Sequence, residues 1–147
     1  MLDFVNIERR MVMGLDSGII VKSIHRKITR EMLPSEIRYP FPNDFNEEVE
    51  ILYWRKNWGL RNAIVDYLPR HGDSDWEYII ESPHQIFNLI KIIVSFMDKD
   101  FWDREGDSIW EYDEILPRLQ QDIVNLAIMA AFMKNNPDIY LIFYDSY

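Results

Sequence analysis

The sequence contains no cysteine, has only five glycines among 147 residues, and includes no long uninterrupted apolar run. The absence of cysteine excludes disulfide bonds, thiolate zinc sites, iron–sulfur clusters and cysteine nucleophiles. The longest apolar windows, residues 86–97 and 127–133, fall far short of the roughly 20 apolar residues that cross a bilayer. The first residues also lack the apolar stretch and small-residue cleavage site of a signal peptide. We therefore expect a cytoplasmic protein without a membrane partner.

The composition is that of a globular, acidic domain. Hydrophobic residues make up 48% of the chain and charged residues 28%, which are typical globular proportions. We expect a single domain over residues 1–147, in which residues 1–12 are either an N-terminal extension or the product of an upstream start. Twenty-five acids against 16 bases give a net charge of −9. This charge argues against direct binding of nucleic acid or of anionic membranes.

Charge is distributed unevenly along the chain. Residues 1–32 contain six bases and four acids, whereas residues 33–147 contain ten bases and 21 acids. The densest acidic stretch, residues 98–114, holds eight acids and only two bases, Lys99 and Arg104. It begins Asp-x-Asp-x-x-Asp, but the glycine that a calcium loop needs at its sixth position is absent. We expect this stretch to be a solvated loop between helices.

The order of apolar patterns predicts an α+β fold, with a small sheet of about three strands backed by three main helices. Strands are predicted over residues 18–21, 76–81 and 139–144, and helices over residues 46–68, 83–97 and about 109–135. In the second strand, Trp76, Tyr78 and Ile80 share one face. The third strand is a continuous apolar run, which is typical of a central strand covered on both faces.

Local signals set the expected ends of the helices. Asn46 has the residue type of an N-cap and two glutamates follow it, whereas Ser82 and Gln85 have the spacing of a capping box. The helix over residues 83–97 is apolar nearly all round, so we expect it to lie deep in the molecule. Residues 123–133 are also expected to be largely buried, in a helix that bends near Pro117.

The helix predicted over residues 46–68 carries the candidate site. At about 100° per residue, Trp54, Trp58 and Arg61 lie on one side, away from an apolar face that begins at Val49. Either the two indoles pack against another helix, or they form a surface that binds a ligand. In the second case the indoles would stack on a flat ring, and Arg55 and Arg61 would hold an anion. The predicted ligand-binding residues are therefore Trp54, Arg55, Trp58 and Arg61.

Lys56 falls in the middle of the apolar face of the same predicted helix. An unpaired ammonium buried there would cost several kcal/mol, so the side chain must reach water or pair with a buried acceptor. We interpret Lys56 as a structural buried charge.

Catalytic motifs are absent from the sequence. It contains no Gly-x-Ser-x-Gly, no glycine-rich phosphate loop and no His-Glu-x-x-His, and its three histidines are isolated from one another. His71, Asp73 and Asp75 alternate as metal ligands can, but they lie in a predicted turn without a further ligand. We predict no catalytic residue, no metal, no cofactor and no enzymatic activity.

Four short motifs resemble small proteins of phages and prophages, a family mostly of unassigned function. The motifs are Met-Gly-Leu-Asp at residues 13–16, Tyr-Trp-Arg-Lys at 53–56, Gly-Asp-Ser-Ile-Trp-Glu-Tyr at 106–112 and Phe-Tyr-Asp-Ser-Tyr at 143–147. The resemblance covers residues 13–147 and implies a phage or prophage accessory protein in the host cell cytoplasm. Many relatives have Ala-Asn-x-Ile-His after the second motif, where this chain has Asn-Trp-Gly-Leu-Arg. No role of that histidine carries over.

Two functions of different classes fit these observations. In the first, an anti-defence protein sequesters a small, anionic, nucleotide-like ligand without catalysis. In the second, an acidic protein blocks a basic surface of a host nucleic-acid enzyme through residues 98–114. The indoles and arginines of residues 54–61 favour the first function. The net charge favours the second, because a negative field slows the approach of an anion. A structural module and a homo-oligomer are compatible with the same sequence.

Overall fold

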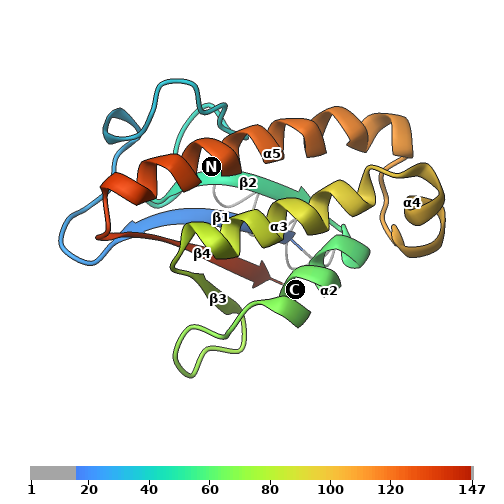
Figure 1. The fold of residues 1–147 in the computed structure, drawn as a ribbon, viewed down its shortest axis with the longest axis horizontal. Helices are drawn as coiled ribbons and strands as arrows, with labels where there is room; N and C mark the ends of the chain where they lie inside the picture. Colours follow the sequence, from blue (N-terminus) through green and yellow to red (C-terminus); the bar gives the residue numbers. More distant parts are fainter. Residues whose placement is uncertain (1–15, 147) are drawn as a thin grey trace.

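The computed structural model describes residues 16–146, which form an α+β fold with helices packed on one face of an antiparallel sheet (Figure 1). Within these residues the sheet has four strands in the order β2-β1-β4-β3. The strands are β1 (Asp16–Ser23), β2 (Val49–Arg55), β3 (Glu77–Ile80) and β4 (Ile139–Ser146). The fold class is confirmed, with four strands in place of three. The predicted extension, residues 1–12, lies outside the described residues.

The additional strand, β2, occupies the first half of the helix predicted over residues 46–68, so this prediction is wrong. Only the second half is helical, as α2 (Trp58–Tyr67). Positive φ angles at Asn46, Glu47 and Lys56 bound β2 on both sides and are incompatible with a continuing right-handed helix. The segment between them is rich in β-branched and aromatic residues and pairs with β1 along its length.

A β-bulge explains why β2 resembles a helix in the sequence. Ile19 of β1 pairs with Leu52, but the next residue of β1, Ile20, pairs with Glu50. Ile51 is therefore the extra residue, and both Ile51 and Leu52 are buried. The bulge interrupts the alternation by which a strand is normally recognised.

The other predicted strands are present, with two corrections. β4 lies between β1 and β3, which confirms the predicted central position, although the helices of the described residues cover only one face of the sheet and not both. Tyr78 and Ile80 of β3 face the core, but Trp76 precedes the strand and is 57% exposed. The outer edge of β3 is covered by the segment that precedes it. His71 N donates to the Glu77 carbonyl (2.8 Å), and Ile79 N donates to the Pro69 carbonyl (3.0 Å).

The helices follow their capping signals. α3 (Pro83–Phe96) begins at the predicted capping box, in which Gln85 N donates to Ser82 Oγ (3.3 Å). The short helix α4 (Lys99–Glu105) forms where we predicted only a loop, with Asp98 Oδ1 accepting from Phe101 N (3.0 Å). The long helix α5 (Tyr112–Asn135) contains Pro117. No helix within residues 16–146 is long and apolar enough to span a membrane.

The core lies between the sheet and the helical layer. α3 and α5 pack along each other and cross one face of the sheet, and α2 packs against α3 (Figure 1). The largest fully buried side chains are Trp54, Phe96 and Phe143, which come from β2, α3 and β4. Of the candidate ligand-binding residues Trp54, Arg55, Trp58 and Arg61, only Trp54 lies in this core.

Candidate functional site

Trp54 does not form a stacking surface with Trp58. Trp54 lies on β2, is 1% exposed, and its Nε1 donates to Asp122 Oδ2 of α5 (2.8 Å). Trp58 is half-buried in the first turn of α2, after the chain has turned at Lys56. The predicted pair of neighbouring indoles depended on one continuous helix, and that helix does not exist.

Arg55 and Arg61 also lie apart from the predicted arrangement. Successive strand residues point to opposite faces of the sheet, so Arg55 projects away from the face that buries Trp54. Arg61 Nε donates to Asp145 Oδ2 of β4 (2.6 Å), and this carboxylate is buried. The anion that Arg61 holds in the structure is therefore a side chain of the same protein.

Lys56 does not lie on an apolar helix face, which corrects the interpretation of this residue. It is half-buried in the turn between β2 and α2, with φ of 49°, and its carbonyl accepts from Ile109 N (3.3 Å). The charged groups that the fold does bury include Asp122 and Asp145. Asp122 could have been found in the sequence, because it falls at core spacing between Leu119 and Leu126.

Asp122 is a buried carboxyl with a neutral donor. Burial raises its pKa to about 7, while the hydrogen bond from Trp54 and the charge of Arg118 act in the opposite direction. A pKa of about 7 leaves this carboxyl partly protonated at neutral pH, whereas an exposed aspartate is ionised.

The described parts of all four motifs meet at one end of the sheet. Asn57, which follows the second motif, pairs with Ser108 of the third, and Trp110 Nε1 donates to the Arg55 carbonyl (3.0 Å). Asp16 lies opposite both Arg55 and Ser146. We call this region the sheet-end cluster.

The sheet-end cluster contains buried polar atoms without hydrogen-bond partners among the described residues. They are Ser17 Oγ, both side-chain atoms of Asn57, and Asp145 Oδ1. Gly59 allows the close approach that shapes this end, since a Cβ there would lie 1.9 Å from the Glu105 carbonyl oxygen. Buried polar atoms of this kind normally bind ordered water.

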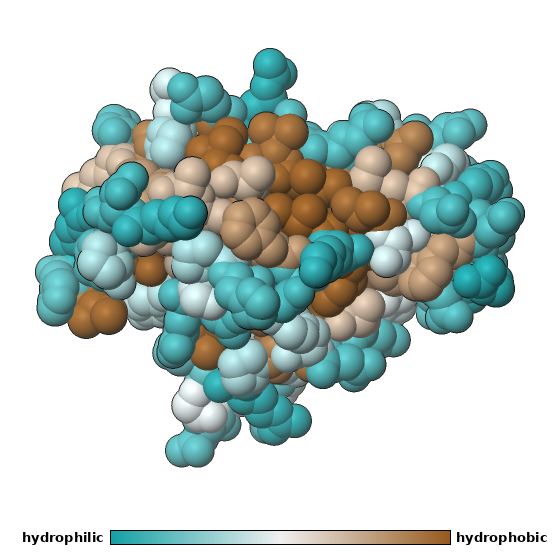
Figure 2. Space-filling view, in the orientation of Figure 1, coloured by the Kyte–Doolittle hydropathy of each residue, from teal (hydrophilic) through white to brown (hydrophobic). Residues whose placement is uncertain are grey.

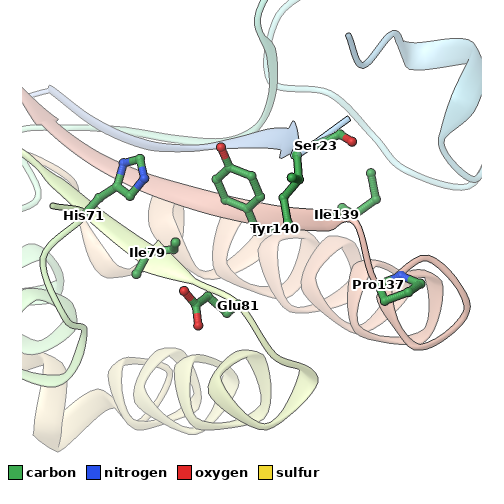
Figure 3. A pocket seen from close by; sticks show the side chains of 8 residues that line it. Ser23, His71, Ile79, Glu81, Pro137, Ile139 and Tyr140 are labelled. Atoms are coloured by element: carbon green, nitrogen blue, oxygen red, sulfur yellow. The ribbon is translucent and has the colours of Figure 1, made fainter. Parts of the chain in front are cut away.

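An open pocket of about 650 Å³ lies beside β3 and β4 (Figure 3). Tyr140, His71 and Glu81 line it, and the rings of His71 and Tyr140 are 6.2 Å apart. The pocket hydroxyl of Ser23 donates to Asp138 Oδ2 (2.7 Å), not to the histidine. The residues of the pocket thus do not form a nucleophile–base pair, and across residues 16–146 no three His, Asp or Glu side chains group as metal ligands do.

The acidic stretch gives the surface one strongly negative end. All eight acids of residues 98–114 are exposed, and they surround α4, at the end of α3 and α5 (Figure 1). One of them, Asp103, pairs with Lys99 (2.7 Å). By contrast, the bases of residues 22–30 are paired with acids: Lys22 with Glu48, Arg26 with Asp138, Lys27 with Glu47, and Arg30 with Asp44.

The outer face of the helical layer is apolar. We expected α3 and residues 123–133 of α5 to be buried, yet Phe87 and Val94 of α3 are each 50% exposed and Val124 of α5 is 47% exposed. Figure 2 shows apolar residues gathered in a band across these helices. The sheet covers only one side of each helix, so the opposite side is left open. We call this surface the helical face.

Comparison of the chain with protein-family models, curated proteins and solved structures finds no match.

Proposed function

We propose that the protein is a non-catalytic accessory protein that binds a basic surface of a host nucleic-acid enzyme and blocks it. The observation that carries the proposal is the excess of exposed acids on residues 98–114, which hold eight exposed carboxylates against two bases, Lys99 and Arg104. A field of this sign accelerates association with a basic partner and opposes association with an anion. The resemblance to phage and prophage proteins supports a target in the host.

A nucleic-acid-binding enzyme is the target class that this charge favours. Such enzymes present clustered lysines and arginines to phosphate groups. The carboxylates around α4 can occupy the same cations, so binding would compete directly with nucleic acid. Competition of this kind requires no catalytic residue in the accessory protein.

Release of proteins from immobilised DNA tests the proposal. Host DNA-binding proteins are loaded on DNA-cellulose and eluted with the purified protein, and the activity of any released enzyme is then assayed with and without it. We expect one enzyme to be released and inhibited. Replacing Asp100, Asp107 and Asp113 by Asn should raise the concentration needed for half-release at least tenfold.

A matched variant controls for total charge. Glu36, Asp66 and Asp73 are exposed acids outside residues 98–114, and replacing them by Gln, Asn and Asn removes the same three charges. If both variants weaken release equally, net charge alone acts and residues 98–114 are not the contact. If the protein releases no enzyme, the proposed function is wrong.

Sequestration of a small anionic, nucleotide-like ligand is the second candidate. The observation in its favour is the set of unpartnered polar atoms of Ser17, which lies opposite Asp145 in the sheet, and of Asn57, whose carbonyl accepts from Arg61 N. Against it, Arg61 is already paired with Asp145 and the indole of Trp54 is sealed in the core. Calorimetry with cyclic and linear nucleotides tests this candidate, and binding that is lost in Asn57→Ala would support it.

A further inference from the structure

The sequence of α3 requires burial on more sides than the fold provides. Its core side holds Ile86, Leu89, Ile93 and Phe96, all buried. Its opposite side still presents the half-exposed Phe87 and Val94, with Lys91 between them. A helix that is apolar nearly all round is normally covered all round. Large apolar side chains left exposed together on one surface commonly mark an interaction site.

α5 extends the same surface. Val124, Ala127 and Ala131 are exposed on the side of α5 away from the core. Because the alanine side chains are short, they project less from the surface than Val124 and the apolar side chains of α3. Because α3 and α5 pack along each other, their open sides form one continuous apolar band (Figure 2).

The acidic stretch lies at one end of the helical face, because it connects the two helices that form this face. α3 ends at Phe96 and α5 begins at Tyr112, so residues 97–111 connect the two helices at one end of the face. A partner lying along the helical face would therefore reach the exposed carboxylates around α4 with its own end. An apolar face that ends in negative charge is complementary to a segment that is apolar on one side and basic at one end.

The helical face suits a helix of a binding partner better than a strand. A strand adds to a sheet edge by backbone hydrogen bonds, whereas the helical face presents the side chains of two helices and not a strand edge. Side-chain packing on two helices instead suits an amphipathic helix. Residues 87–94 of α3 span roughly 10 Å, the length of about two helical turns.

A second copy of the chain fits the charge poorly. It would bring the same eight exposed acids and the same net charge of −9. Like charges across an interface oppose association. The observations therefore favour a partner with basic side chains of its own.

We propose that the helical face binds an amphipathic helix of a partner protein, whose apolar side packs on α3 and α5 and whose basic end lies beside α4. This inference rests on the proposed function, because it names the part of the basic partner that is bound. The acidic stretch accelerates the encounter, and the apolar contact then determines how long the complex lasts.

Two synthetic peptides test the inference. One is an 18-residue peptide of leucine and lysine with leucine on a single helical side, and the other has the same composition in scrambled order. We expect calorimetry to show at least tenfold tighter binding of the amphipathic peptide, together with a gain in its helical circular dichroism. Replacing Phe87, Val94 and Val124 by Ser should abolish this tenfold preference.

A matched variant keeps the number of removed apolar side chains constant. Ile24, Met32 and Trp76 are exposed apolar residues elsewhere on the molecule, and their replacement by Ser should leave the preference intact. Thermal unfolding of both variants checks that the fold is retained. An equal loss of preference in both variants would overturn the inference.

The remaining outcomes separate this inference from the proposed function. If both peptides bind equally and the Asp100, Asp107 and Asp113 variant weakens both, the acidic stretch acts alone and the helical inference is wrong. If neither peptide binds, the helical inference and the charge attraction behind the proposed function both fail. If sedimentation shows a dimer that the Ser variant of the helical face dissociates, a second copy occupies the face and the inference is overturned.

Discussion

The two halves of residues 46–68 adopt different structures although they share the spacing of a single amphipathic helix. The first half is the strand β2 and the second is the helix α2, separated by a left-handed residue at Lys56. Each half also delivers one N–H donor to a buried carboxylate. Trp54 of β2 donates to Asp122, and Arg61 of α2 donates to Asp145. The comparison shows that distant partners decide both the secondary structure and the role of each polar side chain.

The two carboxylates differ in the charge of their partner. Asp145 faces a guanidinium, which supplies a full positive charge, whereas Asp122 faces a neutral indole N–H. A charged donor compensates for the lost hydration of a carboxylate more completely than a neutral one. We therefore expect the ion pair of Arg61 in α2 to stabilise the fold. We expect the hydrogen bond of Trp54 in β2, which leaves Asp122 able to titrate, to make the stability depend on pH.

Removing the guanidinium should have the largest effect. Arg61→Ala leaves Asp145 buried without its cation, and breaking a buried pair in this way costs about 3–5 kcal/mol. Urea unfolding at pH 7 should show this loss in the free energy of unfolding. Arg70 pairs with Asp75 on the surface (3.0 Å), so Arg70→Ala is the control and should cost less than about 1 kcal/mol. Equal effects in the two variants would mean that Asp145 is hydrated in the folded protein.

Asp122 should make the protein less stable as the pH rises. Its pKa in the folded state is about 7, against 3.8 for the unfolded chain. Between these values the folded state retains a proton that the unfolded state has lost, so stability falls with rising pH and the full loss is reached above pH 7. The difference amounts to at most about 4 kcal/mol.

Asp122→Asn isolates this dependence on pH. The amide cannot ionise, yet its oxygen can still accept from Trp54 Nε1. We expect the variant to match the original protein near pH 4 and to exceed it in unfolding free energy increasingly up to about pH 8. If the difference between the two proteins is constant with pH, Asp122 does not titrate in this range.

Local signals in the sequence predicted only the parts of the fold that local chemistry determines. Ser82 and Gln85 set the start of α3 within four residues, and the apolar run of β4 needs no partner to be recognised. β2 could not be predicted in this way, because its bulge at Ile51 hides the alternation and its hydrogen bonds go to β1, some 30 residues away.

Removing the indole N–H should have an intermediate effect. Trp54→Phe keeps an aromatic ring in the core but leaves Asp122 Oδ2 without its donor, which costs about 1–3 kcal/mol. Because the hydrogen bond favours the ionised carboxyl, its loss should also raise the pKa of Asp122 further. Combining Trp54→Phe with Asp122→Asn separates the hydrogen bond from the change in ring size. Strictly additive effects would show that the two side chains do not interact.

For the candidate site, the sequence indicated that Arg61 binds an anion but did not indicate which anion. Arg61 does hold an anion, but that anion is Asp145, 84 residues further along the chain. Nothing near Arg61 in the sequence indicates this pairing. The exposed helical face was missed for a related reason: apolar periodicity shows how much of a helix requires burial, but not whether the same chain covers it.

Lys56, at the junction of the two halves, should show the smallest effect. A non-glycine residue with φ of 49° is strained, and glycine adopts this conformation without a steric penalty. Lys56→Gly should therefore raise the free energy of unfolding by about 0.5–1 kcal/mol, once the greater freedom of glycine in the unfolded chain is subtracted. Lys56→Ala keeps the strain and removes only the half-buried side chain, so it should change stability by about 0.5 kcal/mol or less. A loss of several kcal/mol in Lys56→Ala would instead indicate that Lys56 is a buried charge on a continuous helix. The division of residues 46–68 into β2 and α2 would then be wrong.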